Sequence, residues 1–225
     1  MKKNKEALIS LIVFIAYLLL STYSSNVLTF LGYKNLNTTL KIIISLFYNL
    51  FILLGVIFIY LKIIVKDFKD FKENLKYYVN NYYKYWILVI GLMLISNIIV
   101  SSISNITTPT NQEYIIKLLE KYPIYTLIST IIIAPILEEL IFRLSFRKIF
   151  KNDLLFILLS GLVFGILHLS VAKTLSELLY IIPYSIPGFI FAYTLKKSNN
   201  ILVPISLHMF HNTVLTIIQL ILTAL

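Results

Sequence analysis

The residues best suited to chemistry are two adjacent glutamates in an apolar stretch, Glu138 and Glu139. Glu139 and Arg143 are four residues apart, so in a helix they share a face in the favourable order for an ion pair. Glu138 points about 100° away from that pair and has no partner in its own helix. A carboxylate without a partner in a water-poor setting is the kind of group that serves as a general base. The alternative is that both glutamates pair with arginine near a helix end. Pro135 lies one turn earlier and removes a backbone hydrogen bond beside them.

His168 is the first of three histidines, all of which lie in apolar stretches of the C-terminal half. It ends a helical face that it shares with Gly161, Phe164 and Gly165. Glycines at this spacing allow a neighbouring helix to approach closely, which predicts a small groove that ends in an imidazole. The alternative is a histidine that only contacts a neighbouring helix.

His208 and Asn212 are also four residues apart and project from one face of the last apolar stretch. Two hydrogen-bonding side chains stacked in this way can direct donors at one point, as an oxyanion site requires. They can instead hold two membrane helices together. His211 lies at the side of this face, and helix–helix contact is the better interpretation for it.

The distribution of these residues favours one shared polar site over several unrelated contacts. The histidines and the glutamate pair lie on three separate apolar stretches, and ionisable groups inside a membrane are costly and usually functional. At about 1.5 Å per residue from the flanking basic residues, Glu138 lies about 15 Å deep and His208 about 16 Å. His168 lies about 25 Å deep by the same count, so it joins them only if its helix is tilted or begins inside the membrane.

A glutamate base, an orienting histidine and a pair of donors are the groups needed to activate water against a carbonyl and to stabilise the resulting oxyanion. These groups predict peptide-bond hydrolysis. Other proteolytic patterns are missing, because the sequence has no Gly-x-Ser-x-Gly and no His-Glu-x-x-His. The aspartates Asp67, Asp70 and Asp153 are expected in loops, not facing each other in the membrane.

The composition indicates what positions these groups. Of the 225 residues 59% are hydrophobic and 13% charged, with a mean hydropathy of +0.87, which is too apolar for a soluble domain. We therefore expect an all-α, polytopic helical membrane protein with about seven to eight transmembrane helices. A break at Pro183, Pro187 and Gly188 in the sixth span would raise the number from seven to eight. The predicted spans are residues 7–31, 40–65, 86–104, 123–146, 154–168, 175–195 and 201–222.

Charge sets the predicted orientation. The net charge is +10, and a cytoplasmic N-terminus places the basic residues of 66–84, 143–151 and 196–197 on the cytoplasmic side, as the positive-inside rule requires. Residues 66–86 are expected as a basic, aromatic interface loop, and residues 114–119 as a short interfacial helix. The lysines lie between apolar runs, which excludes nucleic acid as a partner and favours anionic lipid headgroups. With no cysteine, the chain has no disulfide and no thiolate metal site.

Three motifs resemble those of the CPBP family, the CAAX proteases and bacteriocin-processing enzymes also called Abi, which includes the type II CAAX prenyl endopeptidases. The motifs are Glu138-Glu139-x-x-x-Arg143, Phe164-x-x-x-His168 and His208-x-x-x-Asn212. The resemblance covers roughly residues 122–223. It implies water activation by Glu138, water positioning by His168, oxyanion stabilisation by His208 and Asn212, and support by Glu139 and Arg143.

The resemblance leaves the cofactor and the substrate open. Glu138, His168 and His208 form an acceptable zinc ligand set with an open position, and a metal-free glutamate mechanism needs the same residues. We expect a peptide or membrane-protein substrate and a bacterial source, and nothing in the sequence indicates an oligomeric state. Residues 122–225 are expected to form the catalytic core, and residues 1–121 to supply the N-terminal membrane helices and the basic loop within the same structural unit.

Two other functions remain open at this point. A non-enzymatic bacteriocin-immunity protein would use the polar cluster only to hold its helices together. A small transporter would use the same intramembrane charges, but the sequence lacks the expected inverted repeat.

Overall fold

The computed structural model describes residues 2–30 and 32–224. Helices hold 90% of the chain and the described residues contain no strand, so the predicted all-α class is confirmed. The α-helices are α1 (Lys2–Thr22), α2 (Ser24–Phe30), α3 (Thr38–Glu73), α4 (Leu75–Ser104), α5 (Thr110–Lys121), α6 (Pro123–Leu127), α7 (Ala134–Glu138), α8 (Phe146–Ile149), α9 (Asp153–His168), α10 (Ile181–Ser198) and α11 (Leu202–Ala224). Two 3₁₀ segments, η1 (Tyr33–Asn35) and η4 (Leu175–Tyr180), and two π-helical segments, η2 (Ile128–Ile133) and η3 (Glu139–Ser145), complete the order.

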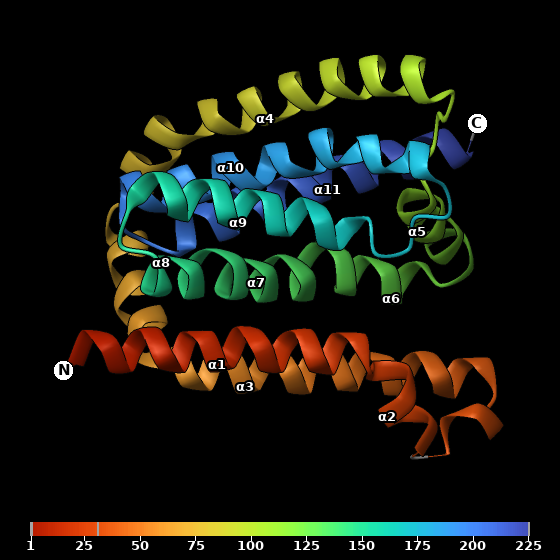
Figure 1. The fold of residues 1–225 in the computed structure, drawn as a ribbon, viewed down its shortest axis with the longest axis horizontal. Coiled ribbons are helices and arrows are strands. Elements are labelled where there is room, and N and C mark those ends of the chain that lie inside the picture. The colour runs from red at the N-terminus through yellow and green to blue at the C-terminus, as the bar shows by residue number, and fades with distance from the viewer. Residues whose placement is uncertain (1, 31, 225) are drawn as a thin grey trace.

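The long helices run side by side along the longest axis of the molecule (Figure 1). In this view α1 and α3 lie at one edge, α6 to α8 come next, α9 to α11 follow, and α4 lies at the opposite edge. The short helix α5 lies at the end away from the N-terminus. It is longer than the interfacial helix predicted over residues 114–119.

Within the described parts of the chain, six helices are long and apolar enough to cross a membrane. They are Lys3–Thr22, Thr38–Glu73, Leu75–Ser104, Pro123–Ile149, Leu175–Ser198 and Leu202–Thr223. The seventh apolar helix, α9, has 16 residues and is about 24 Å long, less than the roughly 30 Å of a hydrocarbon core. The predicted number of seven to eight spans therefore stays a prediction.

One expectation about helix boundaries was wrong, and one possibility left open by the sequence is not realised. Residues 66–86 form no loop, because α3 continues to Glu73 and α4 begins at Leu75. The polar side chains of this stretch hold the junction: Tyr78 donates to Asp70 at 2.5 Å and Asn74 donates to the same carboxylate at 3.0 Å. The sixth span does not break at its prolines either. Pro183 lies in the first turn of α10, where no helical N–H bond is lost, and Pro187 lies within the continuous helix.

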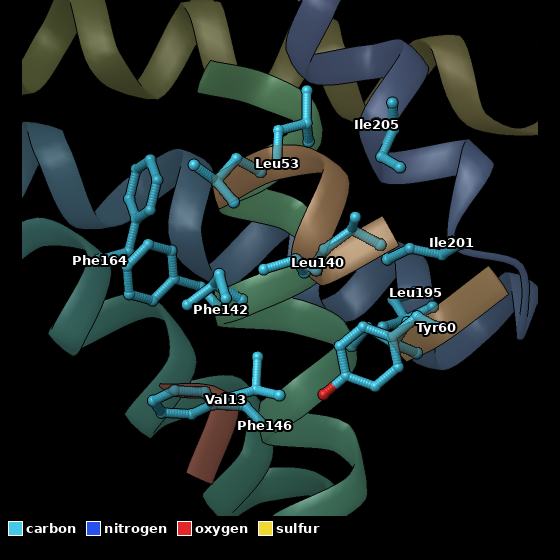
Figure 2. Close-up of a cluster of buried hydrophobic side chains, with 14 of the residues drawn as sticks. Val13, Leu53, Tyr60, Leu140, Phe142, Phe146, Phe164, Leu195, Ile201 and Ile205 are labelled. Carbon is cyan, nitrogen blue, oxygen red and sulfur yellow. The ribbon is translucent and has the colours of Figure 1, made fainter. Parts of the chain in front are cut away.

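A hydrophobic core joins the N-terminal helices to the helix that carries the glutamates. Val13 of α1 and Leu53 of α3 belong to the same buried cluster as Leu140 and Phe142 (Figure 2). Within this cluster the Tyr60 hydroxyl lies 2.8 Å from Ser145 Oγ and donates to Ser10 Oγ at 3.0 Å, so three elements meet at one phenol. The core therefore fixes the fourth span against α1 and α3.

The fourth span is not a regular α-helix. The π-helical segments η2 and η3 lie on either side of α7, so that Glu138 ends α7 and Glu139 begins η3. Pro135 in the first turn of α7 lacks the N–H that a continuous ladder needs, in agreement with the disturbed backbone expected there. π-Helical turns occur often at functional sites, because they change the direction of neighbouring side chains.

Candidate active site

Glu139 and Arg143 form the ion pair that their spacing predicts. Arg143 Nε lies 3.1 Å from Glu139 Oε2, and both side chains are completely buried. The guanidinium carbon also lies 4.4 Å from the centre of the Phe164 ring, where a cation–π contact compensates part of the lost hydration. Buried charges of this kind persist when they are paired, and this pair connects the fourth span to α9.

His208 lies between the two glutamates. Its Nδ1 is 2.8 Å from Glu139 Oε1, and its Nε2 is 3.8 Å from Glu138 Oε2. Because Glu139 is held by Arg143 as a carboxylate, it can only accept, so His208 Nδ1 donates the hydrogen in that bond. Glu139 thereby fixes the ring so that Nε2 points toward Glu138, which is one fifth exposed.

Asn212 is held one turn further along α11. Its Nδ2 donates to the backbone carbonyl of Thr130 in η2 at 2.8 Å. An amide NH₂ has two hydrogens, so a second donor remains after this bond. The contact sets the rotation of α11 against the fourth span.

His168 is the last residue of α9, and its Nδ1 lies 2.9 Å from the backbone oxygen of Phe164. A carbonyl only accepts, so Nδ1 is the donor and Nε2 is left as an acceptor. The imidazole packs between Phe164, at 4.5 Å between ring centres, and Tyr184 of α10, at 5.1 Å. The Phe164 ring thus contacts both His168 and His208, the latter at 5.9 Å between ring centres.

The glycines of α9 bring α10 close, as the sequence predicts. A Cβ on Gly188 would lie 2.7 Å from Gly161 Cα, and one on Gly165 would lie 3.1 Å from the backbone nitrogen of Ser185. Both distances are shorter than ordinary carbon contacts, so the two backbones touch. This approach places Tyr184 against His168.

One cavity of about 370 Å³ brings the four predicted catalytic side chains together. Glu138, His168, His208 and Asn212 all contribute to its wall, with Thr130 among the neighbouring polar groups. The volume lies in the range of small ligand sites. His168 stands at the end of α9 and still lines the cavity with the other three side chains.

His211, expected in helix–helix contact, is buried and packs against Phe191 of α10 at 6.4 Å between ring centres. It also lines the cavity, and its Nδ1 has no hydrogen-bond partner. The sequence did not indicate two further groups in the same wall. From α5, Asn111 and Gln112 line the cavity at the end away from the N-terminus. On α5, Lys117 pairs with Glu113 at 2.5 Å and holds the pKa of that carboxyl below its usual value. No motif distinguishes these positions in the sequence.

The arrangement does not gather a metal site. A catalytic zinc ion takes three protein ligands, and within the described residues no three histidine, cysteine, aspartate or glutamate side chains lie close enough to hold one ion. Zinc at Glu138, His168 and His208 stays a prediction.

Comparisons with known proteins match parts of the chain. Residues 120–214 match the family model described as "Type II CAAX prenyl endopeptidase Rce1-like". The chain is 33% identical over 113 residues to the protein named "Putative membrane peptidase YdiL" of Bacillus subtilis. The aligned part is 49% of this chain and 43% of that protein. It is 32% identical over 142 residues to an uncharacterized protein of Mycoplasma capricolum, covering 58% of this chain and 41% of that protein. The chain thus spans about two fifths of the length of these curated relatives. No solved structure matches the chain.

Proposed function

We propose that this chain is an intramembrane endopeptidase of the CAAX protease family that hydrolyses a peptide bond of a membrane protein or a secreted peptide. The match of residues 120–214 to the type II CAAX prenyl endopeptidase family model supports this assignment. The observation that carries the proposal is the cavity that Glu138, His168, His208 and Asn212 share between membrane helices. A cavity lined by a free carboxylate, two imidazoles and an amide can admit water where lipid otherwise excludes it.

In this mechanism Glu138 is the general base. It takes a proton from water as the water oxygen bonds to the carbonyl carbon of the substrate. Glu138 then returns that proton to the leaving nitrogen as the C–N bond breaks, so the products are a carboxylic acid and an amine. The acceptor Nε2 of His168 orients the water, because Nδ1 is already committed to the Phe164 carbonyl.

His208 and Asn212 stabilise the negative oxygen that develops on the carbonyl. Asn212 supplies the amide hydrogen not used by Thr130. His208 donates from Nε2 when the ring carries both protons, with Nδ1 bonded to Glu139 at 2.8 Å. Arg143 pairs with the other oxygen of Glu139 and so holds Glu139 against His208, which explains why a buried ion pair supports the site.

We also propose that the basic end of the molecule is cytoplasmic. The chain segments there are joined by ion pairs of Asp153 with Arg147 at 2.7 Å and with Lys196 at 3.4 Å. Lysine and arginine concentrate on the cytoplasmic side of membrane proteins. The N-terminus lies at the same end (Figure 1).

The proposal is tested with Glu138→Gln in protein reconstituted into liposomes. Two probes are used: a farnesylated peptide ending in a CAAX sequence and an unprenylated transmembrane peptide, with products identified by mass spectrometry in H₂¹⁸O. We expect the wild type to release a fragment with ¹⁸O in its new carboxylate and Glu138→Gln to release none. Glu73→Gln, an exposed glutamate at the far end of α3, is the matched control and retains activity.

Cleavage by Glu138→Gln at the wild-type rate would refute Glu138 as the base. If the wild type cleaves neither probe, membranes of cells that express the wild type are compared with membranes of cells that express Glu138→Gln. Peptides that disappear only from the wild-type membranes are then tested as further unprenylated probes. No difference between those membranes would refute the protease and leave a non-enzymatic role such as bacteriocin immunity.

A further inference from the structure

A second cavity lies on the other side of Glu138. It has a volume of about 240 Å³ and is lined by residues of α1, α2, α3, η2 and α7. Among apolar side chains its wall carries the hydroxyls of Ser21, Ser24 and Ser129 and the amide of Asn49. Ser21 is exposed and Ser24 half-buried, so the cavity reaches toward the surface at the end of α1.

The two cavities meet at the catalytic carboxylate. Only Tyr17, Ala134 and Glu138 contribute to both walls. Ala134 is small and leaves the boundary thin, and the Tyr17 ring is held edge-on against Phe142 at 5.8 Å between ring centres. Glu138 therefore faces the histidines through one cavity and a set of hydroxyl groups through the other.

Ser129 indicates what the second cavity contains. Its Oγ is buried, and its one protein neighbour, the Tyr125 hydroxyl, leaves part of its hydrogen-bonding capacity unused. Buried hydroxyl groups are normally satisfied, and ordered water is the usual partner when protein supplies none. A space of this volume holds about eight water molecules at roughly 30 Å³ each. Lipid chains are a poor alternative occupant, because they satisfy neither the serines nor Asn49.

We propose that the second cavity is a water store that supplies the nucleophile to Glu138 while the substrate fills the main cavity. This inference rests on the proposed function. Each hydrolysed peptide bond consumes one water molecule, and a substrate that covers His168, His208 and Asn212 blocks entry from the main cavity. Water from the second cavity reaches Glu138 from the α1 side, so α1 and α3 take part in catalysis without a catalytic motif.

The first test measures hydration without any substrate. The chain has no cysteine, so Ser129→Cys carries a single thiol whose reaction with aminoethyl methanethiosulfonate is read by mass spectrometry on folded protein in liposomes. Thiolates form only in contact with water, so we expect Ser129→Cys to react. Ser160→Cys is the matched control: Ser160 is completely buried, is bonded to the Phe142 carbonyl and lines neither cavity, so it should react only after unfolding. A Ser129→Cys thiol as inert as that of Ser160→Cys would overturn the water store.

The second test measures whether the second cavity supplies water for hydrolysis. Ser129→Leu fills the cavity with an apolar side chain, and we expect kcat for the cleaved probe to fall several-fold with KM unchanged. Ser21→Leu, at an exposed position near the mouth, should have the same effect in weaker form and is easily tolerated by the fold. A wild-type kcat in both folded variants would refute the supply of water from the second cavity.

The two proposals fail in different ways. Glu138→Gln should abolish hydrolysis and leave the reactivity of Ser129→Cys unchanged. If the wild type hydrolyses no peptide while Ser129→Cys still reacts, the protease and the supply role are both refuted and only the hydrated cavity remains. If Glu138→Gln is inactive and Ser129→Cys is inert, the protease stands and the water store is refuted.

Discussion

At the scale of single residues, Glu139 has the most demanding position in the site. One oxygen lies 3.1 Å from Arg143 Nε and the other 2.8 Å from His208 Nδ1, with no exposure to solvent. The carboxylate therefore connects the charge of the fourth span to the imidazole of α11. Removing either partner leaves an uncompensated charge inside the protein.

Arg143→Leu tests this connection. We expect a loss of about 3–5 kcal/mol in the free energy of unfolding, because the Glu139 carboxylate stays buried without its cation. Circular dichroism of the detergent-solubilised protein during thermal unfolding measures the loss. Glu139→Met combined with Arg143→Leu should regain most of the stability, since apolar side chains of similar volume replace buried pairs well. The double variant should remain inactive, because His208 Nδ1 has lost its acceptor. Equal melting temperatures for Arg143→Leu and wild type would contradict a fully desolvated pair.

The residue-scale predictions held within helices better than between them. The spacing of Glu139 and Arg143 was sufficient to predict their ion pair, because four residues in a helix define one face. The hydrogen bond from His208 to Glu139 was not predictable, since it depends on how α11 is rotated against η3. The same holds for the stacking of Arg143 on Phe164, whose partner in the predicted motif was only His168.

At the scale of helices, the contact of α9 with α10 decides where His168 and Tyr184 lie. Gly188→Ala places a Cβ 2.7 Å from Gly161 Cα, so the two helices must separate. We expect a loss of about 1–3 kcal/mol in stability, typical of overpacking, together with reduced peptide cleavage. Gly91→Ala in α4 is the matched control, because nothing lies within 4 Å of the added methyl group. Alanine favours a helix over glycine by about 0.5–1 kcal/mol, so this variant should be as stable as wild type or more stable. Equal losses in both variants would mean that the α9–α10 contact is not tight.

The helix scale also shows where sequence patterns were insufficient. Hydropathy identified the apolar stretches, and the small residues Gly161 and Gly165 predicted a close neighbour correctly. The π-helical turns around α7 were not predicted beyond the effect of Pro135, because isoleucine and leucine occupy π and α turns alike. The second cavity was not predicted either. Tyr17, Ser21 and Asn49 look like ordinary residues of membrane helices until η2 packs beside them.

At the scale of the whole molecule, one end carries the basic helix junctions and the other end carries the part of the catalytic cavity that α5 lines. The junctions of α3 with α4, of α8 with α9 and of α10 with α11 lie at the N-terminal end, with the ion pair of Lys148 and Glu6 at 3.0 Å. Asn200 Nδ2 and Ile201 N donate to the Asp67 carbonyl and carboxylate, which fixes α11 to α3 at this end. Asn111 and Gln112 of α5 line the cavity at the other end. The proposed orientation therefore determines from which side a substrate meets the site.

The orientation is tested by labelling single cysteines, for which the cysteine-free chain is a ready background. Lys151→Cys lies in the exposed loop between α8 and α9, and Thr107→Cys lies in the loop between α4 and α5 at the opposite end. If the basic end is cytoplasmic, a membrane-impermeant maleimide added to intact cells should label Thr107→Cys and leave Lys151→Cys unlabelled until the membrane is permeabilised. The reverse pattern would place the N-terminus outside, so that the basic end meets the outer leaflet and the α5 end of the catalytic cavity faces the cytoplasm. Such a result would leave the chemistry of Glu138 unchanged and would require a cytoplasmic source of substrate.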